Sequence, residues 1–336
     1  MPVLNRAHQA RRRQGGVTLV ELMVGLTLGL IVSAALLLLF ANASARGQDL
    51  SRAGSQIENG RYITEMFRED LRLAGFFGEI SQGGAVYSQP NPCDVAPTGW
   101  SGAPFTLPSP VQGYSPADAL PCLPNRKAGT DAIAIRRVDV VSTDPSTVPG
   151  GNSQYYVQYS YCTGDVASPR LVFGTDPSIF TLRNRACSGV NVIRAYVSRI
   201  YYVADCNVCL PASDGVPTLK RVDLVGGALT TTALADGVDM LRFEYGFDVD
   251  GDGSPDAYLT QIGLAGPTSF WSNVVALKAH IVTRSLDKAT GANLATAQEF
   301  QLGGTPVLDF AADGYTRRAY SSAIRLVNPS SVREAQ

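Results

Sequence analysis

The sequence predicts an α+β protein, in which one long N-terminal helix is followed by a mainly antiparallel β-sheet body with disulfide-tied loops. Three observations support this prediction: an apolar run of membrane length over residues 17–40, an apolar seam over residues 50–74, and repeated strand patterns beyond residue 130. The 336 residues suffice for a helical stalk and one large body.

The apolar run contains Glu21 as its one ionisable residue. At about 1.5 Å per residue, a helix over residues 17–40 spans ~36 Å, which is enough to cross a bilayer. The residues before it carry four arginines and no acid, so the N-terminus is predicted to be cytoplasmic and the chain after residue 40 extracytoplasmic. A cleaved secretory signal has a shorter apolar core, and an uncleaved signal anchor stays open as an alternative. Neither explains a costly carboxylate inside the segment.

The residues at the start of this run carry a family resemblance. Gly15-Gly16 followed by VTLVEL resembles the type IV prepilin processing motif, although the family's usual first mature residue is Phe and this chain has Val17. The resemblance implies that a prepilin peptidase of the inner membrane cuts between Gly16 and Val17 and methylates the new amine. It also implies that Glu21, the fifth mature residue, docks against the terminal amine of a neighbouring subunit. Such a buried pair sets register more than it adds stability.

The composition suits a loop-rich and strand-rich body, since charged residues are 17% and the 33 Gly and 20 Pro together make about 16% of the chain. Loss of a leader with four arginines leaves 24 basic against 29 acidic residues, a charge of −5. This charge argues against general nucleic-acid binding. A local basic patch stays open as an alternative, formed by Arg183, Arg185, Arg194 and Arg199.

Six cysteines lie beyond the membrane segment, where disulfides persist, so three bridges are predicted. Of the fifteen connectivities, the simplest joins sequence neighbours: Cys93 with Cys122, Cys162 with Cys187, and Cys206 with Cys209. The last pair has the spacing of a thioredoxin-like redox motif. It follows a strand pattern and not a helix start, which favours a structural disulfide over a redox pair or a zinc site.

The helix is predicted to continue past the membrane and to end near Gly75 and Gly78. Apolar or small residues recur at alternating spacings of three and four: Leu50, Ala53, Ile57, Gly60, Thr64, Phe67, Leu71 and Ala74. This seam is predicted to pack on the protein's own sheet, and a two-stranded coiled coil in a receptor stalk is the alternative.

Residues 83–129 are rich in Pro, Gly, Ser and Asn and are predicted to form a long disulfide-tied loop region. Beyond them, seven segments show strand patterns: residues 131–140, 154–161, 190–203, 219–225, 238–247, 274–284 and 320–327. The predicted domains are a leader (1–16), a transmembrane helix (17–40), its amphipathic continuation (41–78) and a β-rich globular domain (79–336).

Three further segments resemble the PilW family of minor pilins: RLAG at 72–75, WSNVV at 271–275 with IVTRS at 281–285, and RRAYSSAIRLVN at 317–328. The resemblance implies a pilin-like fold and a subunit present in few copies, which helps to prime a type IV pilus and lies at or near its tip. Implied partners are the prepilin peptidase and methyltransferase, other minor pilins and a tip adhesin. Implied roles include twitching motility and attachment. A type II secretion minor pseudopilin is the alternative within the superfamily.

An acidic loop follows the strand at residues 238–247. Asp248, Asp250 and Asp252 alternate, with Gly253 at the sixth position of an EF-hand-like loop, Ser254 at the seventh and Asp256 at the ninth. The twelfth position lacks the usual Glu. The loop predicts a calcium site in a strand-to-loop setting, and a polar hairpin turn is the alternative.

No sequence pattern marks an enzyme. His280 is the one histidine outside the leader, which holds His8, and it lies in a strand pattern typical of a packed structural residue. HExxH, GxxxxGK and GxSxG motifs are absent from the sequence. The sequence therefore predicts a non-enzymatic protein, and a membrane-anchored periplasmic enzyme is the alternative from another class.

Overall fold

The computed structural model describes residues 16–80, 82–165, 170–260, 268–288 and 296–335. The leader up to Gly15, with its arginines and His8, lies outside these residues. The chain divides into two compact units, Met1–Ser51 and Arg52–Gln336.

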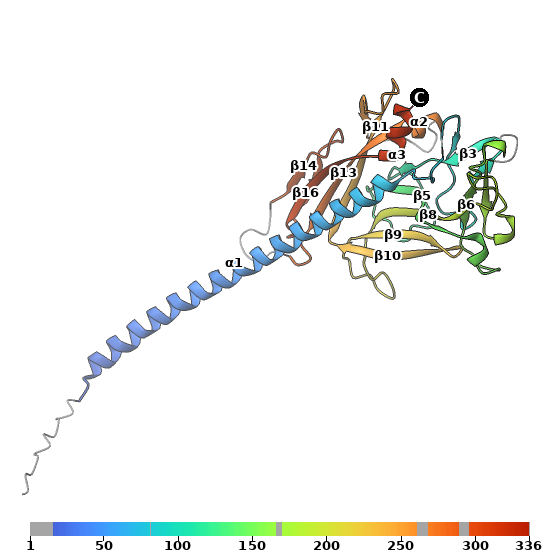
Figure 1. Ribbon diagram of the computed structural model, residues 1–336. Helices are drawn as coiled ribbons and strands as arrows, with labels where there is room; N and C mark the ends of the chain where they lie inside the picture. The colour runs from blue at the N-terminus through green and yellow to red at the C-terminus, as the bar shows by residue number, and fades with distance from the viewer. Residues whose placement is uncertain (1–15, 81, 166–169, 261–267, 289–295, 336) are drawn as a thin grey trace, which may run out of the picture. The chain divides into compact units, whose positions relative to one another are not determined.

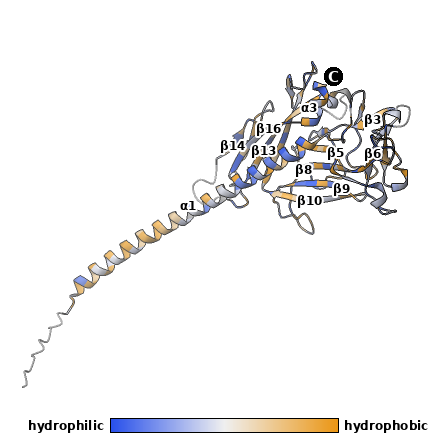
Figure 2. Ribbon diagram, in the orientation of Figure 1, coloured by the Kyte–Doolittle hydropathy of each residue, from blue (hydrophilic) through white to orange (hydrophobic). Residues whose placement is uncertain are grey.

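The described part of the first unit is the beginning of helix α1 (Leu19–Leu73), which continues into the second unit. The large apolar side chains from Leu19 to Phe40 are all at least half exposed, and Figure 2 shows this stretch as the most hydrophobic part of α1. Among the described residues, α1 is the one helix long and apolar enough to cross a membrane. A bilayer or neighbouring helices would cover this surface.

The second unit is built on two main antiparallel sheets (Figure 1). The seven-stranded sheet has the order β10-β9-β8-β5-β4, and β6 pairs with both β7 and β8. Its strands are β4 (Val111–Tyr114), β5 (Ala132–Thr143), β6 (Tyr156–Tyr159), β7 (Leu171–Gly174), β8 (Ile193–Ala204), β9 (Thr218–Val225) and β10 (Ala228–Asp236).

The second sheet has four strands in the order β12-β11-β13-β16. These strands are β11 (Val238–Phe247), β12 (Ala257–Leu259), β13 (Val274–Arg284) and β16 (Arg317–Arg325). The α+β class with a mainly antiparallel body is therefore confirmed, and the strands predicted at 238–247 and 274–284 have the predicted bounds.

Smaller elements complete the body. A three-stranded sheet joins β1 (Val86–Ser88), β2 (Ser101–Gly102) and β3 (Phe105–Pro108), and a hairpin joins β14 (Gln298–Phe300) to β15 (Leu308–Phe310). The helices α2 (Thr268–Ser272) and α3 (Val327–Glu334) flank β13 and β16 in sequence, and short 3₁₀ turns cover Pro145–Thr147, Thr163–Asp165 and Pro177–Ile179.

Residues 83–129, predicted as a long disulfide-tied loop region, contain the Cys93–Cys122 bridge but also the short strands β1 to β4, which were not predicted. Strands of two to four residues are too short to show a period in sequence. The strand β10 was also not predicted, because its sequence, ALTTTALAD, shows no regular alternation of polar and apolar residues and its side chains are mostly exposed.

The main core lies between the second half of α1 and both sheets. Ile63, Phe67 and Leu71 are fully buried there, and the Phe67 ring makes edge-to-face contacts with Tyr201 of β8 and Phe243 of β11 at 5.2 and 5.8 Å between centroids. The helical continuation therefore packs on the protein's own sheets.

The predicted seam is correct at its C-terminal end and wrong further back, where Ile57 is 42% exposed and Leu50 is 74% exposed. Gly60 of the predicted seam is buried, and the other buried positions in this stretch are Gln56 and Ile63. A seven-residue pattern drifts by about 20° per heptad relative to a straight helix of 3.6 residues per turn. The predicted seam therefore turns away from the core as its distance from Phe67 along the helix increases. The helix also ends at Leu73, five residues before the predicted limit.

Candidate functional sites

The start of α1 is a capping box formed by Thr18 and Glu21. The Thr18 hydroxyl accepts a hydrogen bond from the Glu21 backbone N–H at 3.2 Å. In return, the Glu21 carboxylate accepts hydrogen bonds from the Thr18 N–H at 3.0 Å and from its hydroxyl at 2.9 Å. Sequence reasoning missed Thr18, although its spacing of three residues from Glu21 before an apolar run is the signal of such a box.

This geometry changes the expectation for Glu21. Its carboxylate is not free within the chain, because Thr18 satisfies one of its oxygens. Gly16 and Val17 precede the helix in non-helical, exposed backbone, and the predicted cleavage point thus lies where a peptidase can bind an extended chain. The start of α1 thus has an exposed Gly16–Val17 peptide bond, and hydrogen bonds from Thr18 hold the Glu21 carboxylate in place.

The acidic loop brings three carboxylates together. Asp248, Asp250 and Asp256 each offer an oxygen, and these oxygens lie within 4.8 Å of one another. Asp252 is outside this group, and one of its oxygens accepts the Ser254 N–H at 2.7 Å. Of the five predicted ligands, the structure therefore gathers three aspartates at one point.

Asp248 is the buried member of the group and is already compensated within the chain. It accepts hydrogen bonds from the Gly251 and Gly253 N–H groups and forms an ion pair with Arg333 of α3 at 3.2 Å. Burial opposes the charge of Asp248, but these N–H groups and the Arg333 guanidinium outweigh it and lower its pKa. The guanidinium competes with a metal ion for the same carboxylate.

The six cysteines form the three sequence-neighbour disulfides, Cys93–Cys122, Cys162–Cys187 and Cys206–Cys209. Cys206 follows β8 and its sulfur is bonded to Cys209, so this pair closes a short loop. The first two bridges close loops of 29 and 25 residues around the short strands and turns of the body.

Part of the predicted basic patch is engaged within the chain. Arg199 forms ion pairs with Asp70 at 2.7 Å and Asp223 at 3.1 Å, and Arg183 pairs with Asp165. These arginines neutralise the protein's own carboxylates, which leaves less charge for a nucleic-acid backbone.

His280 lies buried in β13 between two side chains of neighbouring strands. Its Nε2 is 2.9 Å from the Glu244 carboxylate of β11, and its Nδ1 is 2.7 Å from the Ser321 hydroxyl of β16. The order hydroxyl, imidazole and carboxylate is that of a hydrolase triad. Ser321 and Ser322 lie in a regular strand, however, where successive N–H groups point in opposite directions and do not converge on an oxyanion.

A buried polar contact joins α1 to the seven-stranded sheet. The Asp70 carboxylate accepts hydrogen bonds from Arg199 at 2.7 Å and from the Tyr201 hydroxyl at 2.7 Å, both on β8. Burial and the adjacent Asp70 charge raise the pKa of the Tyr201 hydroxyl, which therefore stays a donor. This contact fixes the rotation of the helix on the body.

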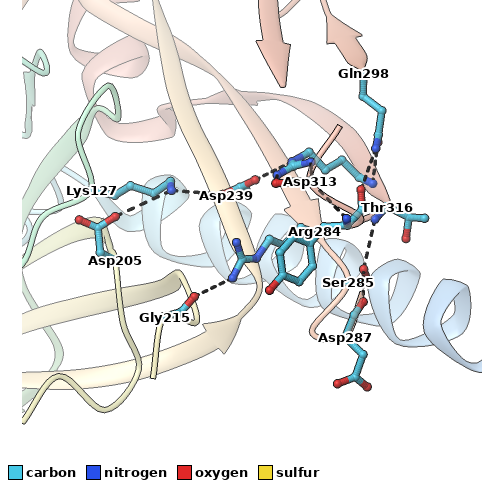
Figure 3. A network of polar contacts seen from close by, with 12 residues as sticks. Lys127, Asp205, Gly215, Asp239, Arg284, Ser285, Asp287, Gln298, Asp313 and Thr316 are labelled. Atoms are coloured by element: carbon cyan, nitrogen blue, oxygen red, sulfur yellow. Dashed lines mark hydrogen bonds and ion pairs between the residues drawn. The ribbon is translucent and has the colours of Figure 1, made fainter. Parts of the chain in front are cut away.

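A second polar network holds the beginning of β16 (Figure 3). Arg317 donates to Asp239 of β11 at 2.6 Å and to both oxygens of Asp313, and Asp239 also pairs with Lys127 at 3.3 Å. The backbone N–H of Arg317 donates to the side chain of Gln298 at 2.8 Å. The first residue of β16 is thereby fixed on several sides.

The outer face of α1 and the strand β16 border a groove of about 1030 Å³. At this place, the helix approaches β16 closely, since a Cβ on Gly60 would lie within 3.0 Å of three Tyr320 ring atoms. Tyr320 also donates to the Gln56 carbonyl at 3.0 Å. The groove is lined by Gly54, Ile57, Glu58, Arg61, Tyr62, Thr64, Glu65, Arg68, Tyr320 and Ser321.

Comparisons with known proteins gave the following matches. Residues 11–37 match the prokaryotic N-terminal methylation motif, and residues 200–328 match the family described as type IV pilus-assembly protein W, PilW. A comparison with curated proteins gave no match. Among solved structures, the chain is similar to a type IV-like pilin from Thermus thermophilus at 10% identity and a TM-score of 0.37, over 81% of this chain and 98% of that one.

The match to the methylation motif, the apolar first half of α1 and the antiparallel body support the class of type IV pilins. Within that class, the match over residues 200–328 supports a minor pilin of the type IV pilus similar to the PilW family. The matched region covers the end of β8, the strands β9 and β10 of the seven-stranded sheet, and the whole four-stranded sheet with the acidic loop. The segment 72–75, by contrast, lies outside it.

Proposed function

We propose that this minor pilin is processed between Gly16 and Val17, primes assembly of the pilus and is incorporated at or near its tip. The observation that carries the proposal is the methylation motif directly before a helix whose first half is apolar and exposed. The large two-sheet body supports a subunit present in few copies. Prepilin peptidase, other minor pilins and a tip adhesin are the proposed partners, and motility and attachment are the proposed downstream roles.

The proposal gives Glu21 two successive partners. Before assembly, Thr18 satisfies its carboxylate within the helix. During assembly, the terminal amine of a neighbouring subunit pairs with the same carboxylate, since an unpaired charge among packed helices costs about 3–5 kcal/mol. The capping bonds keep the acid satisfied in the bilayer until that amine is present.

Two matched substitutions separate these roles. Glu21→Gln keeps an oxygen for the Thr18 N–H and removes the charge, whereas Thr18→Ala removes the hydroxyl and keeps the charge. Both variants are expected to enter the membrane and be processed. Glu21→Gln is expected to abolish surface pili in a deletion strain, and Thr18→Ala to restore them. Restoration by Glu21→Gln would contradict the docking role, and normal piliation of the deletion strain itself would contradict the proposed function.

We propose also that the acidic loop binds calcium. The convergence of Asp248, Asp250 and Asp256 supports this proposal, because hard cations take several carboxylate oxygens at close range. Titration calorimetry of the full chain in detergent is expected to show calcium binding that Asp250→Asn abolishes and Asp252→Asn retains. Arg333→Gln is expected to tighten binding by removing the competing guanidinium. Absence of binding by the unmodified chain would refute the proposal.

A further inference from the structure

The strand β16 is an edge of the four-stranded sheet, and its middle is unpaired among the described residues. The Ser285 backbone N–H donates to the Thr316 carbonyl, and the Leu326 backbone N–H donates to the Val275 carbonyl. In the antiparallel register, the backbone groups of the even-numbered residues of β16 therefore bond to β13. The odd-numbered residues then direct their N–H and C=O groups away from β13. Consistent with this assignment, the Arg317 N–H bonds to Gln298 on the outer side.

Beyond Arg317, the outward groups of Ala319, Ser321 and Ala323 have no hydrogen-bond partner in the described part of the chain, and these three residues are exposed. Five residues of strand extend over about 17 Å. The edge thus presents a row of donors and acceptors long enough to pair with another strand.

The other sheet edges are protected in ways that β16 is not. The long edge strand β10 has a register shift between Ala233 and Ala235, and the outer strands β12 and β4 have only three and four residues. By contrast, β16 pairs with β13 through nine consecutive residues without a shift. Its charged residues stand only at its ends, so its middle lacks the usual devices against edge pairing.

The groove beside this edge is suited to an extended chain. Its floor on α1 includes the half-exposed Ile57, and its charges nearly cancel, because Glu65 pairs with Arg68 and Glu58 lies near Arg61 in sequence. Arg318 is exposed at the start of the free edge and forms no ion pair with a described residue. An occupant is therefore favoured that is uncharged over its length and carries an acid opposite Arg318.

A second copy of β16 fits this edge poorly. An antiparallel copy centred on Ser321 would place Arg317 opposite Arg325 at both ends of the pairing. Like charges directly opposite each other on neighbouring strands are destabilising. The occupant is thus a strand of a different protein and not a second copy of this one.

We propose that the free edge of β16 pairs with an extended, amphipathic strand of another pilus subunit, which adds a fifth strand to this sheet. Its apolar side chains lie on the Ile57 side of the groove, and its polar side chains face solvent. The identity of the partner as a pilus subunit rests on the proposed function above.

The test places a photo-crosslinking residue at Ala319 or at Ala323 in the full chain, in cells that assemble pili, with Thr231 on β10 as the control position. If the strands pair, Ala319 and Ala323 are expected to crosslink to two positions in one segment of another pilus subunit, and these two positions are also four residues apart. Thr231 is expected to give no crosslink to this segment. Crosslinks to a second copy of the chain, to scattered positions or to nothing would overturn the proposal.

A pair of substitutions supplies a second readout. Ala323→Pro removes an outward N–H and leaves the ladder to β13 intact, whereas Ala323→Thr retains the N–H and a strand-favouring side chain. Loss of one hydrogen bond is expected to lower the crosslinking yield at Ala319 about fivefold for the proline variant and little for the threonine variant. Equal yields would overturn the pairing. If the deletion strain has normal pili, the proposed function fails instead.

Discussion

Substitution of Gly60 by Ala tests how α1 lies on the body, because it is expected to destabilise the protein, whereas the same change in an exposed helix stabilises it. In an exposed helix, Gly→Ala stabilises by about 1 kcal/mol. At Gly60, however, the added methyl would lie within 3.0 Å of three atoms of the Tyr320 ring. This ring is held by its own hydrogen bond to Gln56 and cannot yield freely.

Overpacking of this kind costs about 1–3 kcal/mol, and contact with three ring atoms places Gly60→Ala toward the upper end. After the gain in helix propensity, a net loss of ~1–2 kcal/mol remains. Gly54→Ala is the matched control, since Gly54 lies in the same helix and a Cβ there would have no neighbouring atom within 4 Å. The two variants are thus expected to differ by about 2–3 kcal/mol, or ~4–9 °C in melting temperature.

The assay is thermal unfolding of the full chain in detergent, followed by near-ultraviolet circular dichroism. Gly60→Ala is expected to melt below the unmodified chain and Gly54→Ala slightly above it. Addition of Tyr320→Ala is expected to remove most of the penalty of Gly60→Ala, because the methyl then has room. Equal upward shifts for both glycine variants would refute the close packing of α1 on β16.

Three further outcomes are expected. Asp70→Ala should destabilise the protein by about 3 kcal/mol in urea unfolding, because it leaves the charge of Arg199 with one partner fewer beneath α1; no change in the midpoint would contradict this role. The hydrogen bonds of Arg317 lower the pKa of Asp313 from 3.8 to about 2, so the stability they add is present above pH 3.8 and is lost as the pH falls through about 2. Asp313→Asn should therefore weaken the fall in melting temperature over this range, and an unchanged profile would argue against the contact. A fluorophosphonate probe should leave Ser321 unlabelled in the folded chain, and covalent labelling there would favour an enzyme.

The parts of the fold that were predictable from sequence are those with a strong local signal. The strands β11 and β13 consist largely of apolar residues bounded by turns, and their limits match the prediction. The mostly exposed edge strand β10 has no such signal, since its place is set by pairing with β9. Local patterns therefore reveal buried elements better than edges.

The candidate sites divide in the same way. The processing motif is contiguous in sequence, and so is the acidic loop, yet the turn places Asp256 beside Asp248 and directs Asp252 to a backbone N–H. The pairing of Asp248 with Arg333 joins residues 85 positions apart and follows only from the fold. Contacts between distant strands, such as His280 with Glu244, have no signal in a single sequence.

The central claim is that the chain is a prepilin whose leader is removed to expose Val17. Mass spectrometry of the N-terminal peptide, from protein isolated from membranes with an active prepilin peptidase, tests this claim most directly. We expect the peptide to begin at Val17 with one added methyl group on its amine. A chain that retains Met1 in these membranes would contradict the account.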